Sequence, residues 1–73
     1  MHRIGNKYKR VSKLTGKEDI YLLCTTCFYD AILINIETGR CWRTSTRVSS
    51  INEITQEEFE EIAGEYHINF EKI

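Results

Sequence analysis

The pattern of apolar and polar positions is clearest between Ala31 and Val48, where it predicts a β-hairpin. Apolar residues alternate along 32–36 and side chains alternate again along 42–48, the period-two pattern of strands with one buried face. A two-residue turn would place Ile34 opposite Arg43. A three-residue loop, 37–39, places Ile34 opposite Trp42 and gives Gly39 the positive φ it needs, so we prefer it.

This register predicts which residues share a face of the hairpin. One face carries the apolar set expected to be buried: Ile32, Ile34, Ile36 and Trp42. The other face carries Leu33, Asn35, Arg43, Ser45 and Arg47. The second face is therefore the candidate binding face.

Three further strands are predicted from shorter patterns. Segment 4–11 has apolar positions at Ile4, Tyr8 and Val11, and segment 66–70 alternates with its apolar residues towards the core. Segment 19–25 is apolar on both faces, which is typical of a central strand or of one buried at a subunit interface.

A short helix is predicted over about 56–63. Thr55 and Glu58 have the spacing of a capping box, and Ile54 and Phe59 have that of a hydrophobic staple. An apolar stripe at 59, 62 and 63 gives the helix one buried face, and Gly64 is a natural end.

The order of elements, four strands, a helix and a last strand, predicts an α+β fold that is mostly β. Two architectures fit this order: a small SH3-like barrel, or an antiparallel five-stranded sheet with the helix packed on one face. The 73 residues are expected to form one domain, 1–73.

Charge is unevenly distributed although the net charge is only −1. Residues 1–17 contain six Lys or Arg and no acid, whereas 50–73 contain seven acids and one base. The two halves either pair with each other or present faces of opposite sign that favour head-to-tail contacts or a charged partner. No apolar run is long enough to span a membrane, and 1–17 lacks the apolar core of a signal peptide, so we expect a cytoplasmic protein.

Basic residues provide the best candidates for ligand binding. Arg43 and Arg47 share a face of the hairpin, and Arg40 lies near its turn. Lys9 and Arg10 come from the first strand, and Tyr8 between them could stack on a base. Together they could bind a nucleotide-like anion or nucleic acid. The alternative is an ordinary charged surface that pairs with the acidic helix.

The cysteines favour neither a metal nor a disulfide. Cys24 and Cys27 have CxxC spacing, but residues three apart on a strand point to opposite faces. A zinc site would need four ligands, here Cys24, Cys27, Cys41 and His67, and the sequence lacks a second close pair of ligands. We therefore expect the cysteines to be small buried thiols, and we expect no metal or cofactor. No catalytic motif occurs either, and we expect a protein that is not an enzyme.

Two segments resemble a known group of proteins. Residues 33–42, LINIETGRCW, and 54–59, ITQEEF, are similar to small uncharacterised accessory proteins carried by phages and prophages of Gram-positive bacteria, over about residues 19–63. The resemblance implies a phage-encoded protein in the host cytoplasm that antagonises a defence or regulatory factor, by binding a host protein or by sequestering a nucleotide signal. We expect a homo-oligomer; the alternatives are a nucleic-acid-binding SH3-like module and a small zinc protein.

Overall fold

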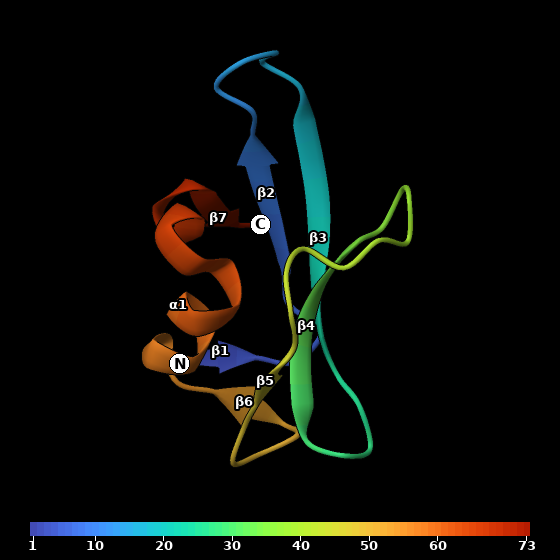
Figure 1. The fold of residues 1–73 in the computed structure, drawn as a ribbon, viewed down its shortest axis with the longest axis vertical. Helices are drawn as coiled ribbons and strands as arrows, with labels where there is room; N and C mark the ends of the chain where they lie inside the picture. The colour runs from blue at the N-terminus through green and yellow to red at the C-terminus, as the bar shows by residue number, and fades with distance from the viewer.

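The computed structural model describes all 73 residues as an open five-stranded antiparallel sheet with one helix against one face (Figure 1). The sheet has the order β5-β4-β3-β2-β7, and its strands are β2 (Lys7–Val11), β3 (Glu18–Thr25), β4 (Asp30–Asn35), β5 (Thr46–Arg47) and β7 (Phe70–Lys72). The antiparallel sheet predicted from the sequence is confirmed. The edge strands β5 and β7 do not pair, so the SH3-like barrel, the other predicted architecture, does not form.

A second, smaller sheet consists of two short strands, β1 (His2–Arg3) and β6 (Glu53–Ile54). The helix α1 (Gln56–Ala63) follows β6 directly, and the 3-10 helix η1 (Gly64–Asn69) leads from α1 to β7. None of these helices has the length and apolarity needed to cross a bilayer.

Helix α1 begins and ends at the residues predicted. The Thr55 hydroxyl accepts a hydrogen bond from the Glu58 backbone at 3.1 Å, and the Glu58 carboxylate accepts one from the Thr55 backbone at 2.8 Å. This reciprocal pair satisfies two donors that the first turn of a helix leaves free. Gly64 ends the helix with φ = 65°, a conformation that favours glycine.

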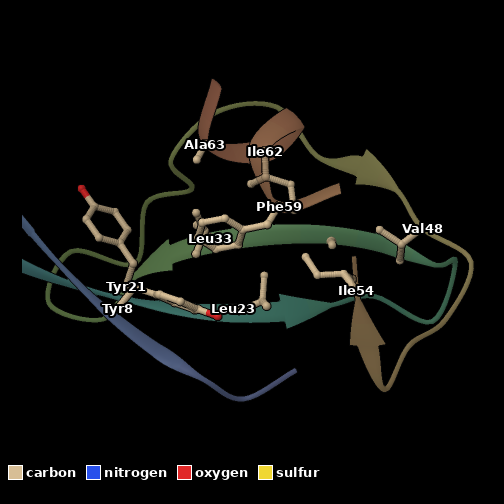
Figure 2. Close-up of a cluster of buried hydrophobic side chains, with 10 residues drawn as sticks. Tyr8, Tyr21, Leu23, Leu33, Val48, Ile54, Phe59, Ile62 and Ala63 are labelled. Atoms are coloured by element: carbon tan, nitrogen blue, oxygen red, sulfur yellow. The ribbon is translucent and has the colours of Figure 1, made fainter. Parts of the chain in front are cut away.

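The hydrophobic core lies between α1 and the inner face of the sheet (Figure 2). Phe59 and Ile62 of α1 point towards Leu33 of β4, while Leu23 of β3 and Ile54 of β6 extend the cluster. Its ten buried members are Tyr8, Tyr21, Leu23, Ala31, Leu33, Val48, Ile54, Phe59, Ile62 and Ala63. The apolar stripe of the helix therefore contacts the sheet as predicted.

The predicted register of the central hairpin is wrong by one residue. Ile34 pairs with Cys41 rather than Trp42, and the Asn35 backbone hydrogen-bonds with Arg40 across a four-residue loop. The cause is the side chain of Asn35, whose Oδ1 accepts hydrogen bonds from the backbone of Glu37 and Thr38 at 2.9 and 3.1 Å. Gly39 has the expected positive φ, 76°.

The predicted buried face of the hairpin is also wrong. Leu33 and Ala31 are fully buried, whereas Ile32 and Ile34 are half-buried on the opposite face and Ile36 is 51% exposed. Residues 31–34 are all apolar, so alternation fits either face, and a one-residue shift exchanges the two faces of a strand. Of the set expected inside, only Trp42 packs against the core.

The first and last strands differ from their predicted bounds. Segment 4–11 is interrupted at Gly5, whose φ is 98°, and forms β1 and β2 on either side. Segment 66–70 is mostly η1, so Tyr66 and Ile68 are exposed rather than directed towards the core. Phe70 begins β7 and packs against the core as expected.

We predict that Leu33→Ala lowers the free energy of unfolding by about 2–5 kcal/mol, the usual cost of a buried leucine. Ile34→Ala, one residue along the same strand, should cost no more than about 1 kcal/mol because its side chain is half-buried on the uncovered face. Urea unfolding at low protein concentration measures both. The reverse ranking would contradict the observed orientation of β4.

We predict that Glu58 makes the stability dependent on pH. Hydrogen bonds from the backbone of Thr55 and then Ser49 hold the pKa of Glu58 below its ordinary value. The stabilisation is therefore complete above the pKa of about 4.3 that Glu58 has in the unfolded chain, and it is lost as pH falls through the lower folded pKa. Glu58→Gln should therefore reduce the fall in the free energy of unfolding that accompanies acidification, measured by urea unfolding at a series of pH values below about 5. Glu57→Gln, which alters a carboxylate without hydrogen bonds, should leave the fall at low pH as large as in the wild type.

Candidate binding surfaces

The fold separates the basic residues that the sequence suggested as one site. Arg10 and Arg43 both approach Tyr66 on the helix side of the sheet. Lys9 lies on the opposite face of β2, because neighbouring strand residues point to opposite faces, and it pairs with Glu18 and Glu71, each at 3.8 Å. The predicted patch is therefore divided between two faces.

Arg40 and Arg47 lie away from this pair of arginines. Arg40 is exposed in the hairpin loop. Arg47 is in β5 opposite Asp30, at the edge of the sheet. Neither side chain forms an ion pair, and neither contacts Arg10.

Tyr8 is not available for stacking on a ligand because its ring is 1% exposed. Its hydroxyl hydrogen-bonds with the His2 ring at 2.6 Å and accepts from Asn6 at 3.3 Å. Burial raises the pKa of Tyr8, and the Asn6 hydrogen bond partly offsets this rise. The His2 ring in turn stacks on Phe59 at 4.1 Å, so Tyr8 belongs to the junction between β1 and α1.

The residues that do converge form what we call the arginine–aromatic cluster: Arg10, Trp42, Arg43 and Tyr66. The Arg10 guanidinium lies 4.5 Å from the centre of the Trp42 ring and 5.4 Å from that of Tyr66. Arg43 lies 5.7 Å from the Tyr66 ring. These distances are typical of cation–π contacts.

Trp42 is the fixed centre of the cluster. Its indole N–H donates a hydrogen bond to the Ala63 carbonyl at the end of α1, at 3.3 Å. Its ring meets Tyr21, Phe70 and Tyr66 edge to face, with centroids 5.4–5.9 Å apart. Arg10 therefore rests on a ring that the core holds in place.

Gly64 makes room for Arg43 in this cluster. A Cβ atom at position 64 would lie 2.5 Å from Nη1 of Arg43, closer than non-bonded atoms approach. The glycine that ends α1 thus serves two purposes, since it also supplies the positive φ of the helix end. Sequence reasoning identified only the second.

Neither arginine of the cluster forms an ion pair; Asp19, which lies opposite Arg10 on β3, pairs with Lys17 instead. The ion pairs of the structure are Lys9 with Glu18 and Glu71, and Lys17 with Asp19, while the His67 ring lies 3.7 Å from the Glu60 carboxylate. The Nε atom of Arg10 is buried and has no hydrogen-bond partner. A buried donor without a partner is uncommon and marks a place where a functional explanation is worth seeking.

The second candidate surface is the outer face of the sheet, which no segment of the chain covers. We call it the open sheet face, and it consists of Ile20, Leu22, Cys24, Ile32, Ile34, Ile36 and Cys41. Leu22 pairs with Ile34 and Cys24 with Ile32, while Ile34 also pairs with Cys41, so these side chains form one continuous apolar area. The core excludes them, because α1 packs on the other face.

The cysteines are distributed over this face and the neighbouring loop. Burial, and then the nearby Cys41, raise the pKa of Cys24, which is half-buried and behaves as a small apolar residue, as expected. Cys27 and Cys41 are exposed, so the prediction of burial is wrong for these two. No three His, Cys, Asp or Glu side chains lie close enough to hold a metal, and His67 instead hydrogen-bonds to the Gly64 carbonyl.

Comparisons with protein-family models, curated proteins and solved structures find no match to this chain.

We predict that Arg10→Ala exposes Trp42, the only tryptophan of the chain. Removal of the guanidinium that covers the ring should shift Trp42 emission to longer wavelength and increase its quenching by acrylamide. The lost cation–π contact should cost about 0.5–1 kcal/mol of stability. Lys9→Ala, its neighbour on the opposite face, should leave emission unchanged; equal spectra for the two variants would contradict the stacking geometry.

Proposed function

We propose that this chain is a small, non-enzymatic binding protein that contacts another protein through the open sheet face. The observation that carries the proposal is the area of Ile, Leu and Cys side chains that α1 leaves uncovered. Contiguous exposed apolar areas on small proteins commonly mark protein interaction sites. Two charged side chains of β2 border this area: Lys7 lies opposite Leu22 of β3, and Lys9 lies opposite Ile20.

The first partner we propose for this face is a second copy of the chain. An interface of standard size, roughly 800 Å² per partner, would occupy about a sixth of the 4958 Å² surface of the molecule. Homodimer interfaces are more apolar than other interfaces, and this face consists of Ile, Leu and Cys side chains. Only 11 of 73 residues are buried in the monomer, and small domains with small cores often gain stability by oligomerisation.

We further propose that the protein acts in the cytoplasm of a bacterial host as a phage-encoded antagonist of a host factor. Support comes from the resemblance of residues 33–42 and 54–59 to phage accessory proteins. Antagonism by protein binding requires no catalytic group, in keeping with a sequence that carries no catalytic motif. The nucleic-acid alternative is less favoured because the basic residues lie on different faces, and the zinc alternative lacks a set of ligands.

The proposal predicts that the wild-type protein self-associates and that Ile34→Lys prevents it. A lysine at the centre of the open sheet face would bury an unpaired charge, which should weaken association by about 100-fold or more. Sedimentation equilibrium over a range of concentrations, with native mass spectrometry, measures this. Ile68→Lys provides the control, since Ile68 is 76% exposed on η1.

Two results would contradict the proposal. A wild-type protein that stays monomeric up to about 100 μM would exclude a second copy as the partner, because even weak specific interfaces reach this affinity. Equal weakening by Ile68→Lys would place the interface elsewhere. The antagonist role is tested by infection assays, in which expression of the protein should raise phage growth in a host that restricts the phage.

A further inference from the structure

A pocket of about 260 Å³ lies beside the arginine–aromatic cluster, on the helix side of the sheet. Its lining comes from the end of β2 and the following turn, and from η1: Arg10, Ser12, Lys13, Leu14, Tyr66 and Asn69. These two segments are more than fifty residues apart in the chain, and the pocket exists only because η1 packs beside β2. No local sequence pattern could have indicated it.

The polar groups of this pocket are suited to an anion. Arg10 and Lys13 are cationic, no carboxylate is among the lining residues, and neither cation forms an ion pair elsewhere. Ser12 and Asn69 add a hydroxyl and an amide that can donate hydrogen bonds. By contrast, the hollow of about 290 Å³ at Lys9 and Lys72 includes Glu71, which already pairs with Lys9.

Arg10 is held in the orientation that such a site requires. Its guanidinium lies over the Trp42 ring at 4.5 Å and near Tyr66 at 5.4 Å. The N–H donors of a guanidinium lie along its edge rather than over its face, and because Nε is buried, a ligand would be bound through the two terminal nitrogens. Trp42 is itself fixed by its hydrogen bond to Ala63. A pre-oriented arginine loses little freedom when a ligand binds, and this favours affinity.

We propose that this pocket binds the phosphoryl group of a small phosphorylated molecule. A phosphoryl group carries several acceptor oxygens and a full negative charge, which matches a guanidinium, an ammonium and two neutral donors. The volume lies just below the range of about 300–1,000 Å³ that is usual for ligand pockets, so it suits a phosphate with a compact organic group rather than a polymer. Leu14, which is 97% exposed at the rim, could contact that organic group.

This site is independent of the proposed protein-binding surface. Arg10 points to the helix side of β2, whereas Lys7 and Lys9 flank the open sheet face on the other side. Failure of self-association would therefore leave the pocket proposal standing, and failure of phosphate binding would leave the sheet-face proposal standing.

The test is isothermal titration calorimetry, with backbone amide chemical shifts, of inorganic phosphate, ribose 5-phosphate and adenosine monophosphate. We expect saturable 1:1 binding of at least one phosphate compound, with shifts at Ser12, Lys13 and Asn69. Arg10→Met should weaken binding by about tenfold or more, the effect of losing a charge-assisted contact. Lys9→Met makes the same change of charge on the other face of β2 and should leave affinity unchanged.

Comparison of the ligands identifies the source of the phosphoryl group. Equal affinity for all three compounds would mean that the pocket recognises the phosphate alone. Tighter binding of one phosphoester would mean that the pocket also contacts the organic part of that compound. If Arg10→Met fails to fold, Lys13→Met, at an exposed turn residue, tests the same pocket and should also weaken binding.

Three results would overturn the proposal. The first is the absence of saturable binding up to about 10 mM of each compound, well above the affinity range of specific small-ligand sites. The second is an equal loss in Lys9→Met, which would mean general electrostatic attraction. The third is binding only to long single-stranded oligonucleotides with a steep salt dependence, which would assign an extended surface instead.

Discussion

The packing of α1 on one face of the sheet is the contact on which the rest of the structure depends. An eight-residue helix is only about 12 Å long, so it can cover only one face of the sheet. Its Phe59 packs against Tyr8 of β2 and Phe70 of β7, and the helix also contacts β4 and β5. The capping box at Thr55 and the buried Ile54 fix where the helix starts, and Gly64 fixes where it stops. A protein with one short helix and a five-stranded sheet must leave the other face uncovered, which is why that face is the first candidate for a partner.

The hairpin loop decides which side chains occupy that face. Asn35 accepts two backbone hydrogen bonds in the loop and thereby sets the pairing of Ile34 with Cys41. Had the loop been one residue shorter, each residue after it would have moved to the opposite face. Trp42 would then point away from Arg10, and the arginine–aromatic cluster would not form. The loop that Asn35 stabilises thus affects both the open sheet face and the arginine–aromatic cluster.

The parts of the fold that could be predicted from the sequence are those with local causes. The helix bounds follow from a cap, a staple and a glycine that lie within ten residues of one another. The orientation of β4 could not be predicted in the same way, because residues 31–34 are apolar on both faces. The sequence also did not indicate that the Asn35 side chain accepts hydrogen bonds from the hairpin loop. The cluster was missed for a different reason: Arg10, Trp42 and Tyr66 come from three distant segments, and the sequence assigned the last two to the core.

The alternation of side chains along β2 explains how so small a chain can carry two surfaces. Lys7 and Lys9 border the open sheet face, Tyr8 enters the core, and Arg10 reaches the cluster on the helix side. The basic segment that looked like one site in the sequence is therefore divided by the period of a strand. Lys9 is paired with carboxylates and Arg10 is not, so the same segment contributes a neutralised border on one side and an unpaired cation on the other. Charge counted along the chain suggested a single basic patch, whereas charge counted by face separates Arg10 from Lys7 and Lys9.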